Sequence, residues 1–141
     1  MTAPTLWYLN GLKKALDATL ALGTAKVMFV SASYTIDQDA HDFINDVSTY
    51  EVTGTGVSAG GVTLGSPTTA VDGATNTVKL SGSNISSINV SACYAVVYVS
   101  TGTPSTSPVV VIVDLSEGTA TNVTVTGVTW NAGGIAILTA A

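Results

Sequence analysis

A glycine-rich stretch between residues 54 and 61 holds the two motifs of this chain that could carry out chemistry. Residues 56–60 read G-V-S-A-G and match the G-x-S-x-G pattern, in which a sharp strand-to-helix turn exposes a nucleophilic serine, here Ser58. Residues 54–59 read G-T-G-V-S-A and match the G-x-G-x-x-G/A pattern of a dinucleotide-binding turn. Each motif carries out its chemistry only in a particular structural setting, so its neighbours decide its meaning.

Neither motif has the partners that its chemistry requires. In hydrolases with this serine turn the histidine follows the serine along the chain, whereas the single histidine, His41, precedes Ser58. A dinucleotide-binding turn opens a helix, but residues 60–63 (G-G-V-T) favour a strand. Glycines at this density supply positive φ angles and close backbone approach. We therefore predict a tight β connection and no enzymatic activity, with four structural glycines: Gly54, Gly56, Gly60 and Gly61.

Carboxylates gather just before this stretch and could bind a cation. Five of the nine acidic residues lie here, namely Asp37, Asp39, Asp42, Asp46 and Glu51. Hard cations such as Ca²⁺ prefer clustered carboxylates. The EF-hand pattern fails because Asp42 stands where that loop requires glycine, and His41 alone is a weak basis for a transition-metal site. We expect solvated loop acids, one of them capping a short turn at 42–47, and no metal or cofactor. Whether the Asp37–Asp46 cluster binds a cation stays open.

The composition indicates a surface covered by hydroxyl groups instead of charges. Only 9% of the 141 residues are charged, against about 25% in typical soluble domains. Arginine is absent, and 14 serines and 22 threonines supply the polar surface. The net charge is −5 without any basic cluster, which argues against nucleic-acid binding and against anionic membranes. Such a surface loses little hydration when buried, so it suits a protein that packs against other subunits.

Neither a targeting segment nor a membrane span is expected. The N-terminal residues lack the positive start of a signal peptide, and the longest apolar runs, such as 109–113, have the length of a strand. The lone cysteine, Cys93, lies within an apolar run and is expected to be a small buried side chain.

One helix is predicted, over residues 6–22. Four leucines recur at steps of three and four residues along one face (Leu9, Leu12, Leu16 and Leu20). Gly23 is expected to end the helix in a left-handed turn. Trp7 and Tyr8 precede the leucine stripe as large apolar side chains, which makes them our candidates for an intermolecular interface.

From residue 24 onward the pattern changes to that of strands. Residues 88–100 and 109–115 predict a long central hairpin, and the apolar parity reverses at Gly127, where we expect a β-bulge. Shorter strands are predicted at 26–32, 61–64, 68–71, 75–80, 123–130 and 135–138. The chain is therefore expected to be mainly β, an antiparallel β-sandwich or jelly-roll-like domain with one N-terminal α-helix. We expect a single domain over 1–141, divided into an N-terminal arm and helix (1–23) and the sandwich (24–141).

Several stretches, taken in order, resemble a family of small virion proteins encoded in the structural gene modules of tailed bacteriophages. The resemblance covers nearly the whole chain apart from residues 71–89. It rests on residues 9–17 (LNGLKKALD), 26–30 (KVMFV), 33–35 (SYT), 41–48 (HDFINDVS), 51–56 (EVTGTG), 59–64 (AGGVTL), 95–98 (AVVY), 101–103 (TGT), 107–108 (SP) and 130–135 (WNAGGI).

This resemblance implies a structural protein of the virion, with decoration (cement) of the head as the favoured role. The implied partners are the major capsid protein and further copies of this chain, bound over capsomer junctions on the capsid surface. A location in the tail or connector, or a host-binding role, is the alternative. Carbohydrate binding would need an exposed aromatic platform, for which Trp130 and Tyr98 are the available side chains.

Overall fold

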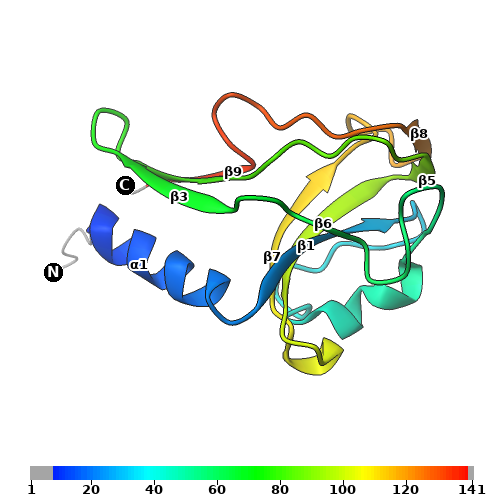
Figure 1. The fold of residues 1–141 in the computed structure, drawn as a ribbon, viewed down its shortest axis with the longest axis horizontal. Helices are drawn as coiled ribbons and strands as arrows, with labels where there is room; N and C mark the ends of the chain where they lie inside the picture. The colour runs from blue at the N-terminus through cyan, green and yellow to red at the C-terminus, as the bar shows by residue number, and fades with distance from the viewer. Residues whose placement is uncertain (1–7, 140–141) are drawn as a thin grey trace, which may run out of the picture.

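The computed structural model describes residues 8–139 and confirms a mainly β fold with antiparallel sheets and one helix at the N-terminal end (Figure 1). The sheets have the strand orders β2-β1-β6-β7, β3-β4-β9 and β5-β8. The elements are α1 (Leu9–Leu20), β1 (Thr24–Val30), η1 (Ile44–Asp46), η2 (Ser48–Tyr50), β2 (Val62–Thr63), β3 (Thr68–Asp72), β4 (Thr77–Ser81), β5 (Val90–Ala92), β6 (Tyr94–Ser100), η3 (Pro104–Thr106), β7 (Val109–Asp114), β8 (Val123–Val125) and β9 (Ala136–Thr139).

The four-stranded sheet is the centre of the molecule, and its two inner strands are buried on both faces. β1 pairs with β6 over seven residues, from Thr24 opposite Ser100 to Val30 opposite Tyr94. Because strand side chains alternate between faces, both strands need apolar residues at most positions, which explains their nearly continuous apolar runs. β-Branched and aromatic residues together occupy nine of the fourteen positions, as expected for strands in this environment.

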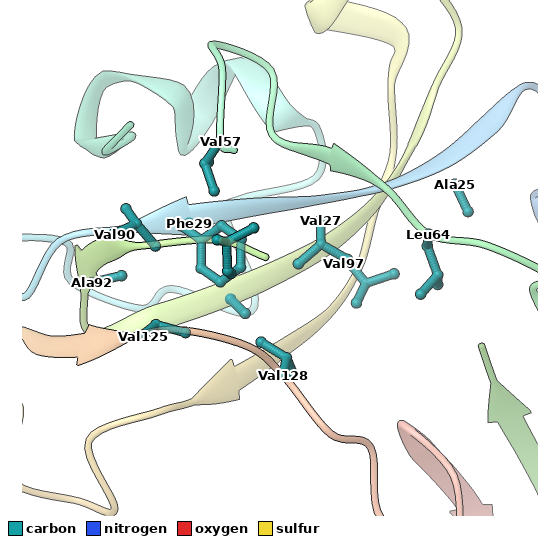
Figure 2. Packing of buried hydrophobic residues seen from close by; sticks show 12 residues of the cluster. Ala25, Val27, Phe29, Val57, Leu64, Val90, Ala92, Val97, Val125 and Val128 are labelled. Atoms are coloured by element: carbon teal, nitrogen blue, oxygen red, sulfur yellow. The ribbon is translucent and has the colours of Figure 1, made fainter. Parts of the chain in front are cut away.

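Two apolar clusters lie on opposite faces of this sheet. Phe29 and Val97 belong to the first cluster, where β5 and β8 supply the facing layer. Figure 2 shows its side chains spread along the sheet from the neighbourhood of Phe29 to Leu64. Met28 and Val96 point to the other face and pack with the second cluster, which the segment 34–47 covers. The chain therefore forms a sandwich-like arrangement in which a loop and two 3₁₀ turns replace one of the covering sheets.

The prediction of one continuous strand over residues 88–100 is wrong, because the structure has two strands there. The chain breaks at Cys93, so that β5 pairs with β8 in one sheet and β6 pairs with β1 and β7 in another. Cys93 itself is fully buried, and its backbone amide donates to the carbonyl oxygen of Val30 at 2.8 Å. A short bend here lets one apolar run contribute to both layers of the core.

The predicted bulge at Gly127 is also corrected. The β5–β8 ladder stops at Val125, and the chain bends before Val128 forms a separate antiparallel bridge with Ile85. Val125 and Val128 are both buried because they belong to two different pairings, and this produces the change of parity seen in the sequence. Gly127 lies at the bend, where a Cβ would come within 2.9 Å of the carbonyl oxygen of Ile85.

The predicted hairpin between the two long apolar runs is confirmed. β6 and β7 pair antiparallel, with a register shift between Val97 and Tyr98 that makes Val110 an additional residue of β7. The connection between the strands contains η3 and is held by Ser107, which is buried. The hydroxyl of Ser107 donates to the carbonyl oxygen of Thr103 at 2.8 Å and accepts the amide of Thr101 at 3.0 Å.

The helix and the β3-β4-β9 sheet form a unit that we call the wing. In Figure 1 the wing lies on one side of the four-stranded sheet, while β5 and β8 lie at the opposite end. Leu16 of α1 faces Val78 and Leu80 of β4, the central strand of the wing sheet. The leucine stripe of α1 is only partly buried, because a sheet of three short strands is too small to cover it.

The end of the helix differs from the prediction. The backbone after Leu20 stays right-handed at Ala21, and Gly23 does not adopt a positive φ. Glycine is needed at position 23 for another reason, since a Cβ there would overlap the carbonyl oxygen of Ser100 on the neighbouring strand β6. Close packing of two chain segments selects this glycine instead of left-handed geometry.

Replacing Gly61 with alanine should lower the free energy of unfolding by more than about 1 kcal/mol. Gly61 has a φ of +76°, and a Cβ there would overlap the carbonyl oxygen of Val27 in β1. Urea denaturation of the wild type and the variant measures the difference. Gly73→Ala is the matched control, because no atom lies within 4 Å of a Cβ at that position. Equal stabilities of both variants and the wild type would contradict the close approach of Gly61 to β1.

Candidate functional site

The glycine-rich stretch folds into a turn that packs against the main sheet. Gly56, Gly60 and Gly61 all have positive φ values, and Gly54 has no room for a Cβ beside the backbone of Asn89. The sequence-based prediction of a tight β connection is therefore confirmed. Each of the four glycines has a conformational or steric requirement.

Two side chains hold this turn at Gly60. The amide of Gly60 donates to Oε1 of Glu51 at 2.7 Å, and the hydroxyl of Tyr98 donates to the carbonyl oxygen of Gly60 at 2.7 Å. Burial, and then the charge of Glu51, raise the pKa of the Tyr98 hydroxyl above its ordinary value, so it remains a donor at neutral pH. Glu51, the last of the clustered acids, thus has a structural role in the turn.

Ser58 and His41 do not form a catalytic pair in this structure. The residue next to Ser58, Val57, packs in the cluster on one face of the main sheet. Nδ1 of His41 lies 2.8 Å from the hydroxyl of Tyr34, which packs in the cluster on the other face. The Ser58 side chain is exposed and has no hydrogen-bond partner among residues 8–139. Activation of a serine needs a base within hydrogen-bond reach, and the geometry shown here supplies none.

The acids of the 37–46 segment stabilise local turns. Oδ1 of Asp37 accepts the amides of Asp39 and Ala40, at 3.1 and 3.0 Å. Oδ2 of Asp46 accepts the amides of Asp42 and Phe43, both at 3.2 Å, which confirms the predicted acidic cap on the short turn. Within the part of the chain that the structure describes, no group of three or more metal-ligating side chains comes together.

The aromatic side chains proposed from sequence occupy different environments. Tyr8 is 89% exposed, and Trp7 lies outside the described residues. Tyr98 is buried, so it is not part of an exposed aromatic platform. Trp130 is half-buried, packs against the first cluster, and donates from Nε1 to the carbonyl oxygen of Ser83 at 2.9 Å. Tyr8 is thus the one of these side chains that is observed to be free for intermolecular contact.

The wing carries exposed apolar side chains that the sequence analysis did not single out. They are Val71 on β3 and Ile137 and Leu138 on β9, where Ile137 is 50% exposed. Val71 and Leu138 lie opposite Val78 in the sheet register, on the face turned toward α1, whereas Ile137 lies opposite Lys79 on the other face. We call Tyr8, Val71, Ile137 and Leu138 the wing residues. A short apolar run such as 135–138 predicts a strand, but it does not reveal that the strand lies at the edge of a small sheet.

One polar contact ties the helix to the wing sheet. The Thr69 hydroxyl on β3 donates to Oδ1 of Asp17, and Lys13 donates to Oδ2 of the same carboxylate at 2.6 Å. The hydrogen bond from Lys13, followed by that from Thr69, holds the pKa of Asp17 below its ordinary value. Asp17 therefore links α1 to β3 most strongly when it is ionised.

The rest of the described surface offers few charges to a partner. Between residues 8 and 139 there are two salt bridges, Lys13–Asp17 and Lys79–Asp72, and both lie in the wing. No helix in that range is long and apolar enough to cross a bilayer. The arrangement is suited to broad contact with another protein surface, in which apolar and hydroxyl groups are buried and few ions lose hydration.

Acidification should weaken the Asp17 contact. A folded-state pKa below the ordinary value of 3.8 means that the ionised carboxylate stabilises the native state above that pH. This contribution is lost as the pH falls through the lowered pKa. We expect the free energy of unfolding to fall less steeply below pH 3.8 in Asp17→Asn than in the wild type, measured by urea denaturation at several pH values. Asp39→Asn, at an exposed loop position, should retain the wild-type slope.

Ser58→Ala should leave the stability of the fold unchanged, because the Ser58 side chain is exposed and makes no hydrogen bond among residues 8–139. A fluorophosphonate probe should not label the wild-type protein. Mass spectrometry after incubation with the probe checks this, with a known serine hydrolase as the positive control. Stoichiometric labelling at Ser58 would show that the serine is activated.

Comparison of the chain with models of protein families, with curated protein sequences and with solved structures finds no match in any of the three.

Proposed function

We propose that this protein is a structural component of a tailed-bacteriophage virion that decorates the capsid, where it cements the shell by binding over capsomer junctions. Its partners would be the major capsid protein and other copies of itself, and neither nucleic acid nor a membrane takes part. The ordered resemblance along nearly the whole chain supports this assignment. The observation that carries it is the low-charge surface with exposed apolar side chains on the wing.

The energetics of this surface favour apolar attachment over ion pairing. Fully burying an aliphatic or aromatic side chain contributes about 1.5–3 kcal/mol. An exposed ion pair contributes about 0–1 kcal/mol. The whole chain has four cationic side chains, and two of them, Lys13 and Lys79, are already paired within the wing. A few wing residues buried against a shell would therefore outweigh all the ion pairs that this chain could form.

A subunit without catalytic chemistry is also what the glycine turn and the acidic segment support. The glycines meet steric needs, and the carboxylates of Asp37 and Asp46 accept backbone amides. Residues that would stand out as an active site are thus accounted for by local structure.

A location in the tail or connector remains the alternative assignment. The two assignments differ in copy number, because a decoration protein is present in many copies per particle and a tail-tip protein in few.

Attachment to purified particles should persist in about 1 M salt, where electrostatic interactions are screened beyond about 3 Å. Removing residues 1–8, which include Trp7 and Tyr8, or changing Leu138 to serine should reduce retention after sedimentation, while the circular dichroism spectrum stays that of a folded β protein. Leu22→Ser is the matched control, since Leu22 is 59% exposed but lies beyond the end of α1, in the turn toward β1.

Two outcomes would contradict this proposal for attachment. Release of the wild-type protein from particles in about 1 M salt would show that attachment is electrostatic. Full retention of the truncated and Leu138→Ser forms at low salt would show that the wing is not the contact surface. Quantification of the bound protein relative to the major capsid protein distinguishes the capsid from the tail: few copies per particle would contradict decoration of the head.

A further inference from the structure

The outer edge of β7 has backbone groups that pair with no described residue. β7 ends the strand order β2-β1-β6-β7, so only one of its sides faces another strand. The amide of Leu115 donates to the carbonyl oxygen of Cys93, and the register continues from Tyr94 opposite Asp114. In an antiparallel ladder, hydrogen-bonded residue pairs alternate with non-bonded pairs. The backbone amide and carbonyl groups of Val111 and Val113 therefore point toward β6. The amide and carbonyl groups of Ile112 and Asp114 therefore point outward.

The chain itself already adds a strand-like segment to the beginning of this edge. The amide of Val109 donates to the carbonyl oxygen of Asp42 at 3.1 Å, and the amide of Ile44 donates to the carbonyl oxygen of Ser107 at 2.9 Å. Phe43 and Pro108 form the antiparallel bridge between these two bonds. The segment then turns away into η1, and among residues 8–139 nothing continues the pairing beyond Val109. The edge is thus able to accept a strand, and most of its length is open.

This open edge lacks the features that usually block unwanted pairing. Natural edge strands often carry lysine, proline or a bulge in their exposed part. The open part of β7, residues 111–113, consists of Val, Ile and Val, all partly buried, and the bulge lies before it at Val110. An unprotected aliphatic edge of this kind favours pairing with another chain.

Hollows flank the edge on both faces of the sheet. A cavity of about 440 Å³ has Val96 and Ile112 in its floor and Tyr34 and His41 in its wall. On the side of the wing, a smaller cavity of about 150 Å³ lies between Leu16, Val78 and Val111. Side chains of a strand point alternately to opposite faces. A strand added along β7 would therefore place successive side chains toward one hollow and then the other.

The larger cavity adds a preference for positive charge. Asp37 and Asp42 line it, and none of the four lysines of the chain does. Their side chains are exposed, so a cation opposite them would remain partly hydrated and would contribute modestly to affinity and more to orientation.

We propose that the outer edge of β7 binds an extended segment of another protein by strand addition, with aliphatic side chains directed into both hollows and a lysine or arginine opposite Asp37 and Asp42. Backbone hydrogen bonds to Ile112 and Asp114 supply the register, and the hollows supply the side-chain preference. The wing residue Leu138 also lines the smaller hollow, but the proposal does not depend on the virion role.

A single extended segment fits this edge better than a second copy of the same strand. β7 lies between the wing on one face and the segment 34–42 on the other, as the residues around the two cavities show. β7 contains no lysine or arginine and ends in Asp114, so a second copy of this strand would offer no cation to Asp37 and Asp42. A peptide of another protein can carry that cation.

Amide hydrogen exchange of the isotope-labelled full chain, followed by NMR, tests the proposal. The probe is a blocked peptide with a central run of consecutive valines, which point to both faces, flanked by threonines and with one terminal lysine. In the free protein the amides of Ile112 and Asp114 should exchange rapidly, while those of Val111 and Val113 are protected by β6. Addition of the peptide should slow exchange at Ile112 and Asp114 and leave Val111 and Val113 unchanged.

Two variants separate the backbone and charge contributions. Ile112→Pro removes the outward amide without removing a bond to β6 and should abolish binding, whereas Ile112→Val should bind as the wild type does. Asp42→Asn should weaken binding of the lysine peptide by about two- to fivefold, as expected for an exposed charge pair, and leave an otherwise identical norleucine peptide unaffected. Should the proline variant fail to fold, the exchange pattern of the wild type decides.

Three results would overturn the proposal. The first is the absence of any binding by the lysine peptide. The second is binding without slower exchange at Ile112 and Asp114, which would place the peptide elsewhere. The third is protection of these two amides in the free protein together with sedimentation as a dimer, which would show that a second copy of the chain fills the edge.

Discussion

The pairing of β1 with β6, buried on both faces, is the constraint on which the rest of this structure depends. Seven residue pairs join the two strands, and the side chains alternate between two apolar clusters. Because neither face can be left in water, the chain must supply a cover for each one. β5 and β8 cover one face, and the segment that runs through η1 and η2 covers the other. The remaining elements lie at the edges of this centre or beyond it.

This constraint also explains why glycines occur where the sequence suggests catalytic motifs. Segments that cross a two-sided sheet approach its backbone closely, and a Cβ at Gly23, Gly54 or Gly61 would overlap a carbonyl oxygen of a neighbouring segment. Gly60 is held instead by polar contacts from Glu51 and Tyr98. The density of glycine in this stretch thus reflects packing against the sheet, and the carboxylate beside it positions a turn instead of a reacting group.

The wing and the edge of β7 are the two surfaces proposed for contact with partners, and they differ in kind. The wing residues present apolar side chains on a unit attached to the main sheet through α1 and through apolar contacts such as those of Leu16. The edge of β7 presents backbone groups between two hollows. Side-chain burial gives broad, salt-resistant adhesion, whereas strand addition gives a defined register. In a chain with few charges, these two proposed kinds of contact would supply the specificity that ion pairs supply in other proteins.

The local pattern of the sequence determined the mainly β class, the helix, the β6–β7 hairpin and the tight glycine turn, since each follows from periodicity or backbone freedom within a few residues. Only the tertiary structure decided the break at Cys93, the bend near Gly127 and the exposure of Ile137 and Leu138. An apolar run has the same pattern whether it forms one strand or two, and whether its sheet is covered on one face or both. Burial depends on which distant segments pack against a strand, and local periodicity does not contain that information.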